Sequence, residues 1–174
     1  MRDGGDLRRE RHVVKVKAKR IFIGLVVVVA LLQLVQPDRV NPAVEPARDW
    51  LASNAPPARV VGSLRAACYD CHSNETKWPW YSRVSPVSWW IVDHIKDGRK
   101  HLNFSDWPHD NPRKARSRWQ NIQDEIESGG MPLKSYTLIH SEARLSATDR
   151  TELMEWVDSE VTRLNQLMGE SDGK

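Results

Sequence analysis

Apolar side chains recur every three or four positions in four stretches of the chain beyond residue 57, the spacing that places them on one face of a helix. No stretch alternates apolar and polar residues as a half-buried strand does. The pattern therefore predicts an all-α fold. We expect its helices over residues 58–71, from residue 85 to near 98, from 112 to 129, and from 146 onward.

Residues at two of the predicted helix starts can satisfy exposed backbone amides. Asp110 or Asn111 precedes Pro112, and proline is favoured in the first turn of a helix. Ser146 is followed three positions later by Asp149, which resembles a capping box. The apolar stripes of these two helices consist of Ala115, Trp119, Ile122 and Ile126, and of Leu153, Trp156, Val157, Val161 and Leu164.

The first forty residues have a different pattern. Residues 21–35 read IFIGLVVVVALLQLV, carry no charge and follow a basic block. This arrangement fits a cleaved secretory signal or a retained signal anchor, and we favour the anchor. We predict a single transmembrane helix over residues 21–36, although a span usually needs about 20 apolar residues. The positive-inside rule then places residues 1–20 in the cytoplasm and the main domain on the other side of the membrane.

Proline and charge divide the rest of the chain. Residues 37–57 hold five prolines and predict a semi-rigid linker, followed by a domain over residues 58–168 and a flexible tail over residues 169–174.

The formal net charge of +3 comes from the N-terminal end, because residues 1–20 carry eight basic and three acidic side chains, which leaves −2 for the remainder. Without a basic face on the domain, we expect no nucleic-acid partner.

The two cysteines of the chain lie in the pentapeptide Cys-Tyr-Asp-Cys-His, residues 68–72. This spacing allows two thiols to reach the two vinyl groups of one porphyrin, and it holds His72 beneath the iron as the proximal ligand. We therefore predict one covalent haem c at Cys68 and Cys71. A thioredoxin-like redox pair would need an alternating strand and helix context.

A structural zinc site is the other reading of a cysteine pair. It would need four ligands. The chain has no second cysteine pair, and His94, His101 and His109 lack the expected spacing.

Met131 is the expected sixth ligand of the iron. It stands in the segment GGMPL, where the glycines end a predicted helix and Pro132 favours an extended conformation at Met131. A methionine fixed on such a loop can place its thioether opposite His72. His94 is the strongest rival, and an open sixth site is a further alternative. The other rivals are His101, His109 and His140.

Two long stretches resemble the bacterial haem-binding domain family of small exported c-type cytochromes. They read CYDCHSNETKWPWYSRVSPVSWWIVDHIKDGRKHLNFSDW and MPLKSYTLIHSEARLSATDRTELMEWV, and together they cover roughly residues 57–160. The resemblance implies a small cytochrome c-like helical domain around one covalent haem, with His72 as a ligand. Together with the predicted anchor, it implies a single-pass protein of a bacterial inner membrane, with the haem domain facing the periplasm. Met131 falls at the Met-Pro element of the family, although Leu133 stands where the family often has a second proline.

Two functions follow from these expectations. An iron with both axial positions filled favours electron transfer, so we expect an electron carrier rather than an enzyme. We expect its partner to be a redox protein of unknown identity, and we expect the N-terminal helix to contact the membrane. The alternative is a haem-based sensor or a peroxidase-like haem protein with an open or displaceable sixth ligand. In that case His94 or His101 could act as a distal acid–base group.

Overall fold

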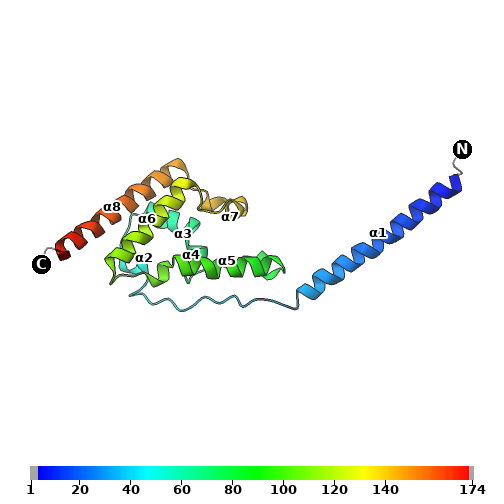
Figure 1. Ribbon diagram of the computed structural model, residues 1–174, viewed down its shortest axis with the longest axis horizontal. Coiled ribbons are helices and arrows are strands. Elements are labelled where there is room, and N and C mark those ends of the chain that lie inside the picture. Colours follow the sequence, from blue (N-terminus) through cyan, green and yellow to red (C-terminus); the bar gives the residue numbers. More distant parts are fainter. Residues whose placement is uncertain (1–3, 173–174) are drawn as a thin grey trace. The chain divides into compact units, whose positions relative to one another are not determined.

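The computed structural model describes residues 4–172 of the 174-residue chain. The described residues form helices and turns without any strand, which confirms the all-α prediction (Figure 1). The α-helices are α1 (Gly4–Leu32), α2 (Trp50–Ser53), α3 (Ala58–Ala67), α4 (Tyr69–His72), α5 (Val87–His101), α6 (Pro112–Ser128), α7 (Lys134–Ile139) and α8 (Ala147–Asp172). Short 3-10 helices are η1 (Trp80–Arg83), η2 (Phe104–Asp106) and η3 (Ser141–Ala143).

The chain divides into two compact units. One contains the N-terminal segment to Asp38 together with Pro79–Val92, and the other contains Arg39–Trp78 together with the residues from Asp93 onward. Helix α5 begins in the first unit and ends in the second.

The first unit holds the helix that we predicted to span a membrane. Among residues 4–172, no helix combines the length and the apolar character needed to cross a membrane. The predicted anchor over residues 21–36 is therefore wrong, and so are the inner-membrane location and periplasmic orientation that depended on it. Helix α1 ends at Leu32, so its apolar part from Ile21 spans only about 18 Å, whereas a hydrocarbon core is roughly 30 Å thick.

The end of the apolar run is fixed by hydrogen bonds rather than by further helix. The Gln33 side chain donates to the carbonyl of Ser85 at 3.1 Å and accepts from the Ser85 amide at 2.9 Å. The Trp89 indole donates to the carbonyl of Val35 at 2.8 Å. These bonds attach the segment after α1 to the start of α5 within the first unit.

The second unit is built on the pairing of α6 and α8, which lie side by side, with α3 packed against α8 (Figure 1). The predicted apolar stripe of α6 is buried in this core. Trp50 from the proline-rich segment is also buried, only 1% exposed, and its ring meets those of Trp119 and Trp156 edge-on at 5.1 and 4.8 Å. The segment predicted as a linker therefore supplies a central core residue.

The helix caps agree with the sequence. Asn111 caps α6 by accepting from the Lys114 amide at 3.0 Å, and Gly129 ends that helix with a positive φ of 73°. Ser146 and Asp149 exchange two hydrogen bonds at the start of α8, as in a capping box. The predicted single helix over residues 58–71 is broken at position 68 into α3 and α4, and the residues predicted as a tail are helical through Asp172.

Candidate functional site

The segment with both cysteines forms a single turn in the second unit. Cys68 lies at the break between α3 and α4, where its carbonyl accepts from the amides of Cys71 at 3.2 Å and His72 at 2.9 Å. Tyr69 anchors this turn in the core, because it is 2% exposed and stacks on Phe104 with ring centroids 5.1 Å apart. The two thiols and the imidazole are therefore presented by one rigid turn.

The His72 ring is oriented by two backbone carbonyls. Its Nδ1 lies 3.0 Å from the carbonyl oxygen of Gly98 and 3.1 Å from that of Leu102. A carbonyl can only accept, so Nδ1 carries the proton and Nε2 keeps its lone pair. Burial lowers the pKa of His72, although the two carbonyls oppose that shift. His72 is thus a neutral imidazole with a fixed tautomer, the state in which histidine ligates a metal.

Helix α5 approaches this turn closely at Gly98. A Cβ atom at this position would lie 3.0 Å from the carbonyl oxygen of Cys71 and 3.4 Å from Cε1 of His72. The first contact is tighter than a side chain normally makes, so the helix or the turn would have to move by a few tenths of an ångström to admit one. The absence of one at Gly98 allows the helix to bring its carbonyl to His72.

The two thiols lie in an environment that favours the protonated form. Burial raises the pKa of Cys68 to about 12 and that of Cys71 to about 11, and they are not joined as a disulfide. A thioredoxin-like pair depends on a lowered thiol pKa, so this environment opposes that alternative. Within residues 4–172, no three His, Cys, Asp or Glu side chains converge as a metal-ion site.

Asp70, between the two cysteines, joins the turn to two other segments. Its carbonyl accepts from the Thr76 hydroxyl at 2.7 Å, and its carboxylate accepts from the Lys77 amide at 3.0 Å. The Tyr136 hydroxyl donates to the same carboxylate at 2.8 Å. Since Tyr136 belongs to α7, this bond holds the start of that helix at the cysteine turn.

Met131 lies on the loop that enters α7. It is half-buried, its peptide bond to Pro132 is cis, and its amide donates to the carbonyl of Glu125 at 3.1 Å. Glu125 lies in α6, so this bond fixes the loop to the end of a core helix. The Met131 loop is thus attached on one side to Glu125 of α6 and on the other, through Tyr136, to the cysteine turn.

The other candidate histidines have different surroundings. His94, His101 and His109 are exposed, and Nδ1 of His101 lies 3.7 Å from a carboxylate oxygen of Asp97. His140 is partly buried. Its Nδ1 lies 3.1 Å from Glu142, and its ring stacks on Tyr136 with centroids 4.2 Å apart.

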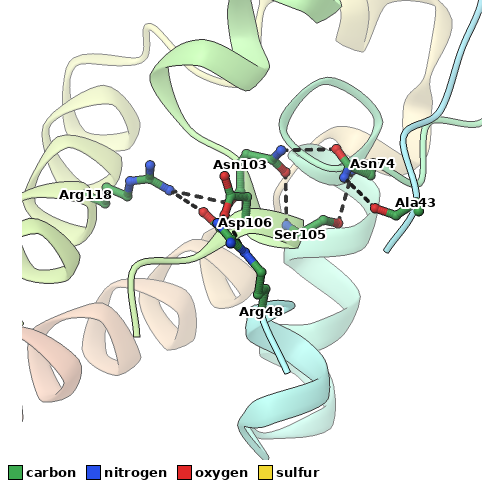
Figure 2. Close-up of polar contacts among 7 residues, drawn as sticks. All are labelled: Ala43, Arg48, Asn74, Asn103, Ser105, Asp106 and Arg118. Atoms are coloured by element: carbon green, nitrogen blue, oxygen red, sulfur yellow. Dashed lines mark hydrogen bonds and ion pairs between the residues drawn. The ribbon is translucent and has the colours of Figure 1, made fainter. Parts of the chain in front are cut away.

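The loop after His72 is held by a polar network that sequence reasoning missed (Figure 2). The Asn74 amide donates to the hydroxyl of Ser105 at 3.1 Å, and the Asn103 side chain donates to that of Asn74 at 3.1 Å. Asn103 directly follows Leu102, so the network fixes the residue that supplies the second carbonyl to His72. The only sequence signal was the density of short polar side chains in the segments SNET and LNFSD.

The same network extends to α6 in Figure 2. The Arg118 guanidinium donates to the carbonyls of Asn103 at 3.4 Å and Asp106 at 3.1 Å. Arg48 forms an ion pair with the Asp106 side chain. The segment after α5, from Asn103 to Asp106, is therefore hydrogen-bonded to the core helix α6 through Arg118.

Arg99, directly after Gly98, is a second residue that the sequence analysis did not single out. Its guanidinium donates to four acceptors around the loop after His72: the Ser73 carbonyl at 2.7 Å, the Thr76 hydroxyl at 2.8 Å, the Asn41 side chain at 2.9 Å and the Val40 carbonyl at 3.1 Å. Arg99 thus ties the proline-rich segment to the cysteine turn.

Comparison with known proteins gives one match. The model of the family described as "Haem-binding domain" matches residues 27–159, which include the cysteine turn, the Met131 loop and most of the core. No curated protein and no solved structure matches the chain significantly. The specific likeness to cytochrome c therefore stays a prediction.

Proposed function

The chain belongs to the haem-binding domain family, and from this premise we propose that it is a c-type cytochrome with one covalent haem that transfers electrons. Family membership makes the chain a haem protein. The covalent attachment, the two axial ligands and electron transfer are our proposals.

Cys68 and Cys71 are the proposed attachment sites. Each thiol would add across one vinyl group of the porphyrin: a carbon–sulfur bond forms, the thiol hydrogen passes to the other vinyl carbon, and no group or electron leaves. The two residues begin and end one turn that is closed by the Cys68 carbonyl, which supports their action on the same porphyrin edge. The product would weigh as much as the chain plus one haem.

His72 is the proposed proximal ligand, and its hydrogen bonds carry the proposal. Because Nδ1 donates to the carbonyls of Gly98 and Leu102, Nε2 is left for iron, and the ring cannot turn without losing both bonds. A hydrogen bond from the non-ligating nitrogen also makes the imidazole a stronger donor to the metal. The arrangement is the one expected for a permanent axial ligand.

Met131 is the proposed distal ligand. Support comes from its loop, which is fastened to Glu125 at its start and, through Tyr136, to Asp70 beyond its end. A methionine ligand needs such a fixed loop, since the iron–thioether bond is weak. Haem iron with a histidine and a methionine ligand exchanges electrons at a raised potential without binding a substrate. We therefore propose that the partner is another redox protein.

The test uses the full chain produced with a haem c maturation system. The wild type should gain the mass of one haem and keep its colour through unfolding and acid-acetone extraction. Replacing Cys68 and Cys71 together by serine should abolish this colour completely. A colourless wild type with two free thiols would refute covalent attachment.

The distal ligand has a separate test. Met131→Ala should lose the weak far-red sulfur-to-iron band of the ferric protein and have a lower reduction potential. Met154→Ala is the matched control, because Met154 packs against the core and should keep the band. A high-spin wild-type spectrum with rapid carbon monoxide binding would instead favour the sensor or peroxidase-like alternative.

A further inference from the structure

Two buried donors at the cysteine turn have no acceptor in the described part of the protein: the Tyr69 hydroxyl within the turn and the Trp78 indole beside it. Among the described residues, the buried side-chain polar atoms without a hydrogen-bond partner are Tyr69 OH, Trp78 Nε1, Arg116 Nε and Trp119 Nε1. Buried N–H groups are almost always paired in native proteins, so each of these atoms calls for a partner or an explanation. An indole N–H can only donate, so its missing partner must be an acceptor.

Trp78 differs from the other indole in its position. The two residues before it, Thr76 and Lys77, both donate to Asp70, which lies between the two cysteines. These bonds hold the backbone just before Trp78 at the side of the cysteine turn. Trp119, by contrast, is fully buried in the core among other tryptophan rings. The Tyr69 ring, 2% exposed, stacks on Phe104 in the same core.

Two arginines around this segment already have partners in the protein. Arg99, which would otherwise be the obvious partner for an anionic ligand, donates to four protein acceptors, among them Ser73 and Thr76. Arg65, on α3, lies 3.7 Å from the carboxylate of Glu75. The indole of Trp78 is left as a donor in this segment without a protein acceptor.

We propose that the Trp78 indole donates a hydrogen bond to a propionate carboxylate of the haem. The propionates are the hydrogen-bond acceptors that a haem presents to the protein, because its pyrrole nitrogens are bound to iron and the rest of its edge is apolar. A bond from N–H to a carboxylate is charge-assisted and strong. This inference rests on the proposed attachment at Cys68 and Cys71, and it makes Trp78 a positioning residue.

The bond has a measurable consequence. A hydrogen bond to an ionised carboxylate stabilises the charged form, so the propionate should ionise at lower pH than it would without the indole. A negative charge near the iron stabilises the oxidised state. The reduction potential should therefore fall as pH rises through the ionisation of the propionate, and the position of this fall reports the bond.

The experiment compares Trp78→Phe with Trp119→Phe in the haem-loaded full chain. Both changes remove a buried indole N–H without a protein acceptor, which makes them a matched pair. Trp78→Phe should keep the covalent haem, shift the propionate bending band in the resonance Raman spectrum and move the fall in potential to higher pH. Trp119→Phe should leave the band and the fall in potential where the wild type has them.

A measurement on the wild type covers the case in which Trp78→Phe does not fold. In the ferrous protein, the Trp78 indole proton should show a nuclear Overhauser effect to the propionate methylene protons. If the wild type carries covalent haem but shows no such effect, the inference is overturned. It is also overturned if the Raman band and the reduction potential of Trp78→Phe do not move. Either result would mean that the indole donates to a water molecule instead. A wild type without covalent haem would instead refute the proposed function itself.

Discussion

Replacement of Gly98 by alanine tests whether α5 rests directly on the cysteine turn. The added Cβ would lie 3.0 Å from the carbonyl oxygen of Cys71 and 3.4 Å from Cε1 of His72. The carbonyl belongs to the backbone of α4, whose turn is closed by bonds to Cys68, so it cannot rotate away as a flexible side chain would. The helix or the turn must therefore shift.

The expected magnitude is the difference of two effects. Forcing an extra methyl group into a packed contact costs about 1–3 kcal/mol. Replacing glycine by alanine inside a helix contributes about 1 kcal/mol of stability. Gly98→Ala should therefore lower the free energy of unfolding by up to about 2 kcal/mol.

Gly62→Ala is the matched control. Gly62 lies inside α3, and no atom lies within 4 Å of the position of its added Cβ. This variant should gain about 0.5–1 kcal/mol in the free energy of unfolding, because it has the helix benefit without the collision. The two variants should then differ by about 1–3 kcal/mol, the cost of the collision alone.

Urea unfolding of the haem-loaded chain, followed by circular dichroism, measures these free energies. The reduction potential provides a second measurement. Displacing Gly98 lengthens its bond to Nδ1 of His72, which weakens the imidazole as a donor to iron and should raise the potential. Gly62→Ala should leave the potential unchanged. If Gly98→Ala gained as much stability as Gly62→Ala, the close approach of α5 would be refuted.

Three further predictions concern the bonds that hold the Met131 loop and α8. Tyr136→Phe removes the bond to Asp70, so it should lower the free energy of unfolding by about 1–2 kcal/mol. If Met131 is the distal ligand as proposed, imidazole should also displace it several-fold more readily in an absorption titration, and an unchanged imidazole affinity would contradict a link between α7 and the Met131 loop. Ser146→Ala should cost about 1 kcal/mol in thermal unfolding by removing the cap of α8, and an unshifted midpoint would contradict that cap. Hydrogen bonds from Ser146 and the charge of Arg59 lower the pKa of Asp149. The contribution of its carboxylate to the free energy of unfolding is therefore complete above about pH 4 and is lost as pH falls further. Asp149→Asn should flatten this part of an acid-unfolding profile, and a profile identical to that of the wild type would count against these bonds.

The sequence determined the features that depend on neighbours along the chain. The period of apolar residues predicted the all-α fold and the buried face of α6, and Asn111, Gly129 and Ser146 marked helix ends where the structure has them. Caps and periodicity act over three or four residues, so they can be read before any tertiary contact is known. The cysteine motif likewise pointed to the haem protein that the family match supports.

The failed prediction of a membrane span shows where local reading stops. Hydropathy counts an apolar run over residues 21–35, but it does not show where the helix ends. Helix α1 ends at Leu32, and side chains such as Gln33 then bond to the start of α5, more than fifty residues away. Ser85, the hydrogen-bond partner of Gln33, lies too far along the chain for a hydropathy window to include it.

Tertiary structure alone decided how the candidate site is held. Neither Gly98 nor Leu102 could be identified as an acceptor for His72, and nothing near Asp70 in the chain pointed to Tyr136. The burial of Trp50 was equally unreadable within a run of prolines. Sequence periodicity specifies which face of a helix is apolar, but the carbonyl that an imidazole meets depends on how separate helices pack, and this is fixed only when the whole core forms.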